Sequence, residues 1–128
     1  MNIMEQIRLD PDGDWNWAFL SYHFKLSEDF IREFKDKVDW DYISCKQNLS
    51  EDFIREFKDK IDWCNISINQ NLSEDFIREF KDRVNWCYIS KENLDNIKDI
   101  SLLSEFYDKI DHNNLDEETY IVLQLLKG

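Results

Sequence analysis

Apolar and charged positions follow one another along this chain in a pattern that recurs every 23 residues. Four apolar residues stand at i, i+1, i+4 and i+8, which is the spacing of one face of an α-helix. Ser27 precedes the first copy of this stripe and is a favourable N-cap residue. The pattern therefore predicts a helix of roughly 12 residues in each unit. The first stripe consists of Phe30, Ile31, Phe34 and Val38.

A second, shorter helix is predicted after each stripe. In the first unit Asp39 can cap this helix, and its inner face carries Trp40, Ile43 and Ser44. The polar run 46–48 then turns the chain. A helix pair this small cannot bury its own apolar stripe, so it must stack on its neighbours.

The unit occurs three times without insertion or deletion, and the phrase LSEDFIREFKD is identical in all three copies. Trp17 lies 23 residues before Trp40 and begins a half-repeat. A fixed period of this size is typical of stacked supersecondary units. The sequence thus predicts an all-α fold of short helix-turn-helix tandem repeats, stacked as an α-solenoid with a cap at each end. The single predicted domain, 1–128, comprises an N-terminal cap and half-repeat (1–25), repeats 26–48, 49–71 and 72–94, and a degenerate repeat with an acidic C-terminal cap (95–128).

The C-terminal segment keeps the stripe in a degenerate form. Its apolar residues are displaced by 26 positions from those of the third repeat, and His112 takes the place of the tryptophan. Asp116 can cap a last helix, 117 to 127, that is apolar on nearly all sides. We expect this helix to close the core, and pairing with a second copy in a homodimer is the alternative. The degenerate stripe is Leu102, Leu103, Phe106 and Ile110.

Composition restricts the class of function. Cys45, Cys64 and Cys87 are expected to be packed thiols in a reducing compartment. His23 and His112 lie too far apart to suggest a metal site, and nothing indicates a cofactor. No Ser–His or Cys–His pair and no Gly-rich phosphate loop is found, so we expect no enzyme. No apolar run reaches the roughly 20 residues that cross a bilayer, so an intracellular, cytoplasmic protein is expected.

Charge indicates the kind of partner. The net charge is −12, and residues 95–128 contribute −5 from eight acids and three bases. This balance disfavours direct binding to nucleic acid or to an anionic membrane, and it favours a protein partner with a basic surface. The charged face of the first helix predicts two acid-first i, i+4 ion pairs, Glu28–Arg32 and Glu33–Lys37.

Differences between the repeats fall on the second helix and the turn after it. In a solenoid such positions can form a recognition surface, and neutral drift after duplication is the alternative explanation. The acidic cap is a second candidate, because its carboxylates could imitate a nucleic acid in front of a basic groove. The predicted partner-binding residues are Tyr42, Lys46, Asn65, Asn69, Tyr88 and Glu92 on the repeats, and Asp108, Asp111, Asp116, Glu117 and Glu118 in the cap.

The phrase W-x-x-I-S-x-x-Q-x-L-S-E-D-F-I-R-E-F, which runs from Trp40 to Phe57, resembles short tandem repeats in proteins of giant DNA viruses and of some low-GC bacteria and phages. That family has no enzyme motif to transfer. The resemblance implies a viral or phage-type factor that binds and inhibits a host protein. A self-associating structural scaffold is the alternative function.

Overall fold

The structure is a computed structural model that describes residues 1–127, and within this range every regular element is helical. The chain forms two compact units, Met1–Asp62 and a second that begins at Trp63. The first unit contains α1 (Ile3–Leu9), α2 (Trp17–His23), α3 (Glu28–Glu33), α4 (Trp40–Lys46) and α5 (Glu51–Glu56). The second contains α6 (Trp63–Asn69), α7 (Glu74–Glu79), α8 (Lys91–Asp95), α9 (Ile100–Glu105), the 3-10 helices Tyr107–Lys109 and His112–Asn114, and α10 (Glu117–Lys127).

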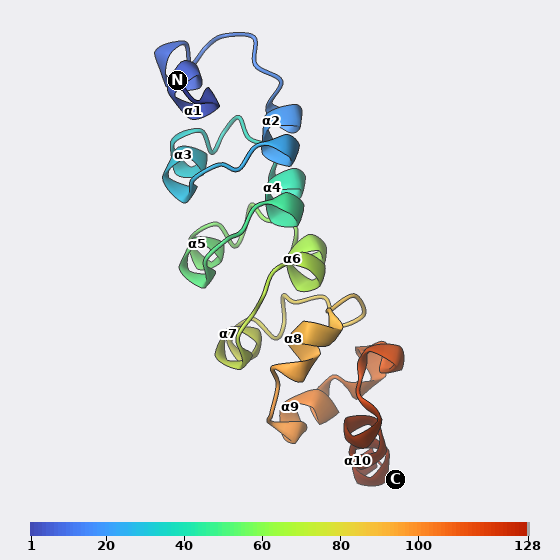
Figure 1. The fold of residues 1–128 in the computed structure, drawn as a ribbon. Helices are drawn as coiled ribbons and strands as arrows, with labels where there is room; N and C mark the ends of the chain where they lie inside the picture. Colours follow the sequence, from blue (N-terminus) through green and yellow to red (C-terminus); the bar gives the residue numbers. More distant parts are fainter. Residues whose placement is uncertain (128) are drawn as a thin grey trace. The chain divides into compact units, whose positions relative to one another are not determined.

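Helix pairs stack on one another within each unit (Figure 1). In the first unit α1, α3 and α5 lie in one row, and α2 and α4 lie side by side in a second row. In the second unit α10 packs against α9. The predicted all-α architecture of stacked short helix pairs is thus confirmed, whereas the single-domain organisation stays a prediction.

The first helix of each repeat is half as long as predicted. α3 has six residues, and Phe34 follows it as the C-cap. The N–H groups of Lys37 and Val38 both donate to the Phe34 carbonyl, at 2.9 and 3.1 Å, so the chain continues in tight turns. The indole N–H of Trp40 donates to the Lys35 carbonyl at 2.9 Å. That bond satisfies a backbone carbonyl in the turn after α3, and the apolar stripe stays buried across the break.

The predicted pair Glu28–Arg32 is wrong, because both side chains bind the following repeat. The Glu28 carboxylate accepts hydrogen bonds from the N–H and Oγ of Ser50, at 2.6 and 3.0 Å. Arg32 Nε lies 2.8 Å from a carboxylate oxygen of Glu56. A carboxylate is favoured at a helix N-terminus, whereas an exposed i, i+4 pair contributes only about 0.2–0.5 kcal/mol.

The predicted pair Glu33–Lys37 is also wrong, since α3 ends at Glu33 and no helical turn brings the two together. Glu33 instead pairs with Arg8 of α1 at 2.9 Å. Lys37 donates to the Pro11 carbonyl at 2.7 Å and lies 3.2 Å from Asp12. The charged face therefore links the first repeat to the N-terminal segment.

The N-terminal segment packs as a degenerate first helix. The guanidinium of Arg8 lies 5.4 Å from the centre of the Phe30 ring, and the same arrangement recurs one repeat later. The Trp15 indole donates to the Asp10 carbonyl at 2.7 Å, which spans five residues as the Trp40 bond does. The N-terminal cap predicted from the sequence is therefore itself built on the repeat pattern.

Each tryptophan that begins a second helix packs on the first helix that follows it in the chain. Trp40 lies over Phe53 and Phe57, with ring centroids 6.2 and 5.0 Å apart. Trp17 and Trp63 repeat this packing on the equivalent phenylalanines. Trp86 is buried and stacks on Phe106 at 4.4 Å. The tryptophans thus join one repeat to the next.

A buried side-chain amide fixes the turn between repeats. Gln47 is 5% exposed and accepts a hydrogen bond from the N–H of Leu26 at 2.9 Å. Its Nε2 donates to the carbonyls of Ser21 and Phe24, at 2.9 and 2.7 Å. We call this set of three bonds the amide bridge. It satisfies backbone groups at the end of α2 that would otherwise be buried without partners.

The third repeat keeps the amide bridge but departs from the predicted second helix. Asn93 bonds the Leu72 N–H and the carbonyls of Ser67 and Gln70, at 2.9, 3.1 and 2.8 Å. Asparagine is one methylene shorter than glutamine, so its backbone must lie closer to these groups. Residues 86–88 form a turn, and α8 begins after the N-cap Ser90.

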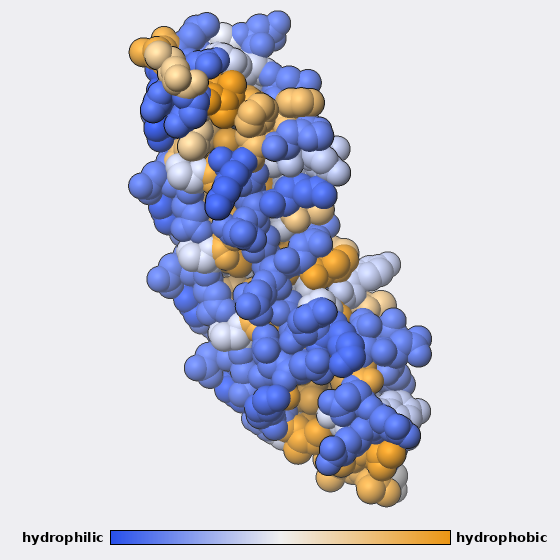
Figure 2. Space-filling model, in the orientation of Figure 1, coloured by the Kyte–Doolittle hydropathy of each residue, from blue (hydrophilic) through white to orange (hydrophobic). Residues whose placement is uncertain are grey.

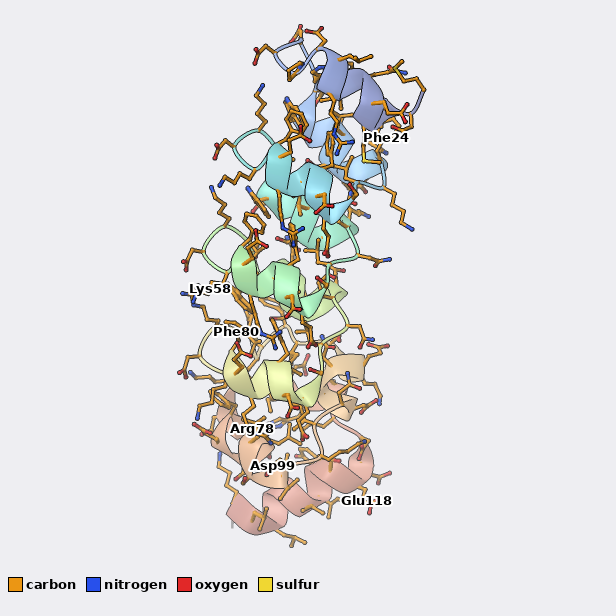
Figure 3. All side chains as sticks on the ribbon, turned by 90° about the vertical axis from the view of Figure 1, so that its left-hand side faces the viewer. Phe24, Lys58, Arg78, Phe80, Asp99 and Glu118 are labelled. Carbon is orange, nitrogen blue, oxygen red and sulfur yellow. The ribbon has the colours of Figure 1, made fainter. Side chains whose placement is uncertain are left out.

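The fourth repeat begins at Asp99, the N-cap of α9. The Asp99 carboxylate accepts hydrogen bonds from the hydroxyl and the N–H of Ser101, and Arg78 lies 3.0 Å away (Figure 3). These bonds lower the pKa of Asp99. Glu74 accepts from the N–H groups of Lys98 and Asp99, at 2.5 and 2.7 Å. The fourth stripe follows the third by 26 residues and not by 23. Even so, Glu74 contacts the N-cap of the next first helix, as Glu28 contacts Ser50.

Replacing Gln47 by leucine should destabilise the fold strongly. The substitution removes the amide bridge and leaves buried backbone groups without partners, which we expect to lower the free energy of unfolding by about 2–4 kcal/mol. Urea unfolding followed by tryptophan fluorescence measures this. The control is Asn48→Ala at the exposed neighbouring position, expected to stay within about 0.5 kcal/mol of wild type. Equal stability of Gln47→Leu and Asn48→Ala would contradict this role.

Candidate protein-interaction surface

The residues predicted for partner binding are divided between the two units. Tyr42 and Lys46 lie on the exposed side of α4 in the first unit. Asn65 and Asn69 lie on α6 in the second unit. Tyr88 lies in the turn 86–88 and Glu92 lies on α8, which corrects their predicted places on a second helix and its following turn. Tyr42 and Lys46 lie in a common cluster with other aromatic side chains.

That cluster lies on the outer side of α2 and α4, and we call it the α2/α4 surface. Tyr22 of α2 meets Tyr42 of α4 edge-on, with ring centroids 5.2 Å apart. The Lys46 ammonium lies 4.5 Å from the centre of the Tyr22 ring. Phe19 is 50% exposed and Tyr42 is 40% exposed. The α2/α4 surface comprises Phe19, Tyr22, His23, Phe24, Tyr42 and Lys46.

Helical spacing determines which side chains reach this surface. Ile43 and Ser44 are fully buried and fix the inner face of α4. Since each residue turns the helix by about 100°, Tyr42 and Lys46 fall about 40° apart on one side. Asp41 falls on the other side of Tyr42 from Lys46. The face of α4 that meets Tyr22 therefore carries an aromatic ring and an ammonium group.

Two hollows lie side by side, and Tyr22 and His23 line both of them. We call one the aromatic hollow (about 270 Å³) and the other, which contains Lys25 and Lys46, the lysine hollow (about 310 Å³). The first is smaller than a usual small-molecule site, and the second is at the lower end of the usual range. The aromatic hollow is lined by Asn16, Ala18, Phe19, Tyr22, His23 and Tyr42. The lysine hollow is lined by Tyr22, His23, Phe24, Lys25, Leu26, Lys46, Gln47 and Asn48.

The sequence analysis missed the α2 half of this surface. It compared only the three full repeats, whereas Phe19 and His23 occupy the positions of Tyr42 and Lys46 in the half-repeat. A compositional signal was also present. The stretch 15–26 contains five aromatic residues and a single charged one, Lys25, in a chain that is 34% charged.

A larger hollow, about 530 Å³, lies in the second unit beside the turn 86–88. Trp86, Cys87 and Phe106 line it together with charged side chains of both signs. Several of these charges are paired, since Lys81 lies 3.2 Å from Glu105 and Asp108 pairs with Lys127. The lining therefore presents no converging charge of one sign.

The acidic cap does not form a continuous row of carboxylates. Asp108 pairs with Lys127, and Asp111 accepts a hydrogen bond from the N–H of Asn113 as a cap of the second 3-10 helix. Asp116 caps α10 by accepting from the N–H of Thr119 at 2.7 Å, as predicted. The predicted residues Glu117 and Glu118 are exposed in the first turn of α10.

One side of α10 is apolar and exposed. Leu123 is buried against the rest of the unit, which agrees with a role in closing the core. Ile121, Val122, Leu125 and Leu126 form a stripe on the outer side, and Leu125 is 76% exposed. Figure 2 shows hydrophobic atoms gathered at the end of the second unit where α10 lies. α10 therefore has one buried face and one exposed apolar face, and pairing with a second copy through the exposed face stays a prediction.

The part of the chain that the structure describes contains no cluster of three or more histidine, cysteine, aspartate or glutamate side chains placed to hold a metal ion. In the same residues no helix has both the length and the apolar character needed to span a membrane. The α2/α4 surface is the candidate site, because its aromatic rings contact one another and are exposed.

Comparisons of the chain with protein-family models, curated proteins and solved structures found no match. The resemblance of Trp40–Phe57 to viral and phage repeats accordingly stays a prediction.

Asp116 should titrate below the ordinary aspartate value. Its hydrogen bonds from the backbone and side chain of Thr119 lower its pKa from 3.8. A carboxylate with a lowered folded-state pKa stabilises the fold above pH 3.8, and this contribution is lost as the pH falls through the folded pKa. NMR titration of the Asp116 carboxyl carbon measures the value directly. A pKa at or above 3.8 in the folded chain would show that the cap does not bind the charged form.

Proposed function

We propose that this chain is a non-enzymatic protein-binding repeat module and that the α2/α4 surface contacts the partner. The observation that supports this is the exposed, mutually contacting set of aromatic side chains around Tyr22 and Tyr42. Aromatic residues are enriched in the cores of protein interfaces, where tyrosine and tryptophan often provide much of the binding free energy. Isolated exposed apolar residues need no such explanation, but a contiguous cluster does.

The contacts made by the charged residues of the repeated phrase support the same proposal. Glu28, Arg32 and Glu33 bind neighbouring repeats, so the most regular charged row of the sequence serves the fold. The α2/α4 surface differs, because its aromatic rings remain accessible. From the resemblance of the repeat phrase we propose further that the partner is a host protein which a viral or phage-type factor inhibits. The net charge of −12, which favours a basic partner surface, is a property of the whole chain and not of the α2/α4 surface itself.

Imitation of a nucleic acid by the acidic cap stays a prediction. Asp108, Asp111 and Asp116 each serve a local ion pair or cap, and no observation favours a duplex-like spacing of their charges. The aromatic surface is therefore the basis of the proposal.

Capture of a partner should depend on Tyr42. We expect Tyr42→Ser to reduce recovery of a lysate protein by the tagged chain about tenfold or more, since loss of an interface hot spot costs about 2 kcal/mol. The matched control is Tyr88→Ser. Tyr88 occupies the same repeat position, is 57% exposed and lies in the other unit. Recovery is quantified by mass spectrometry.

Two results would contradict the proposal. In one, Tyr42→Ser and the wild-type chain recover the partner equally. In the other, Tyr88→Ser abolishes recovery while Tyr42→Ser does not, which would place the contact in the second unit.

Self-association is the second candidate function, and the exposed stripe on α10 favours it. Four neighbouring aliphatic side chains with Leu125 at their centre are unusual on the surface of a charged chain. Two copies could bury these stripes against each other in an isologous contact.

Self-association through α10 predicts a mass that rises with concentration in light scattering. Leu125→Lys should then restore a monomer at all concentrations, because a charge cannot be buried in an apolar contact. The control is Leu9→Lys, since Leu9 is 73% exposed on α1 and comparable with Leu125 at 76%. A wild-type mass that stays monomeric at every concentration would exclude this function.

A further inference from the structure

We propose that the α2/α4 surface binds a linear, acidic segment of the partner, with an apolar side chain in the aromatic hollow and a carboxylate in the lysine hollow. This inference rests on the proposed function and specifies the chemistry of the partner. Its basis is a chemical difference between the two hollows: one is lined mainly by aromatic rings and the other contains two lysines. Tyr22 and His23 form the wall that the two hollows share.

The aromatic hollow suits an apolar side chain. Phe19 and Tyr42 line it, and both rings are substantially exposed. The only titratable groups in its lining are His23 and the two tyrosines, and it contains no carboxylate and no lysine. Burial of an aliphatic or aromatic side chain between these rings removes apolar surface of both partners from water.

The lysine hollow suits a carboxylate. Lys25 and Lys46 contribute the charged groups of its lining, and no aspartate or glutamate is among its eight lining residues. Asn48 and His23 add further polar groups at its border. A carboxylate accepts charge-assisted hydrogen bonds from ammonium groups, and these are stronger than bonds between neutral groups.

The two lysines are available for such a contact. Most cationic side chains of the first unit have a carboxylate partner, as Arg8, Arg32 and Lys37 do. Among the described residues, by contrast, Lys25 and Lys46 form no ion pair. The Lys46 ammonium lies over the Tyr22 ring, which holds it at the border of both hollows.

Neither acid at the start of α4 lines the lysine hollow. By helical spacing Asp41 falls on the side of Tyr42 away from Lys46, and Asp39 accepts the N–H of Tyr42 as the N-cap of α4. The net charge of −12 belongs to the whole chain. At physiological ionic strength charges more than about 8 Å away are largely screened, so the contacting segment meets the local lysines.

Selection from a displayed library of random linear peptides tests the inference on the full-length chain. We expect the enriched peptides to contain aspartate or glutamate near an aromatic or aliphatic residue. A fluorescently labelled enriched peptide should bind about tenfold more weakly to Lys46→Glu, and its affinity should fall as salt rises from 50 to 500 mM. The double variant Lys25→Glu/Lys46→Glu should select basic peptides.

Lys35→Glu is the matched control. Lys35 is exposed in the same unit, forms no ion pair among the described residues and does not line either hollow. The inference is wrong if Lys35→Glu weakens binding as much as Lys46→Glu does, or if the enriched peptides are basic. Neutral peptides whose binding still needs Tyr42 would overturn the acidic specificity and leave the proposed function standing. Absence of any enrichment above a Tyr22→Ser/Tyr42→Ser variant would contradict the inference, whereas the proposed function fails only if capture of a partner does not depend on Tyr42.

Discussion

The packing of each second-helix tryptophan on the phenylalanines of the following first helix is the contact on which this fold depends. Helices of six or seven residues are too short to be stable alone in water, because nucleation costs more than so few hydrogen bonds return. Trp40 compensates by burying its ring against Phe53 and Phe57 and by donating its N–H to the preceding turn. The amide bridge of Gln47 then fixes the adjoining turn. Each repeat is therefore stable only when it is stacked on its neighbours.

This mode of stacking also determines which surface is left for a partner. Carboxylates such as Glu28 bind the next N-cap, and arginines such as Arg32 bind the next first helix, so the charged side of the repeats is occupied by the fold. On the other side α2 is the first helix of its row in the described chain (Figure 1), and Phe19 on it is 50% exposed. The aromatic rings of the half-repeat remain exposed there, beside Tyr42 and Lys46. The proposed binding surface thus lies where the row formed by α2 and α4 begins.

Local rules made much of the fold predictable. Ser27 caps α3, and Phe30 and Ile31 are buried as helical spacing predicts. Phe34 and Val38 are buried too, although the helix ends before them. His112 stands in the tryptophan position, and its ring nitrogen lies 3.2 Å from the carbonyl five residues earlier, as a tryptophan's would. The ion pairs and helix lengths were not predictable, because they depend on contacts between repeats. The turn at Tyr88 was not predicted either, because LSEDFIREFKD precedes it unchanged from the other repeats. Of the candidate surface, Tyr42 and Lys46 were predicted. The aromatic composition of 15–26 marks the half-repeat as unusual, but the contact of Tyr22 with Tyr42 depends on the packing of α2 beside α4.

Hydrogen-exchange mass spectrometry of the chain with and without a captured partner tests the central claim most directly. If the α2/α4 surface is the contact, peptides covering 17–26 and 40–48 gain protection on binding, while those covering 72–94 are unchanged. Protection confined to 72–94, or to α10, with no change in the first unit would contradict it.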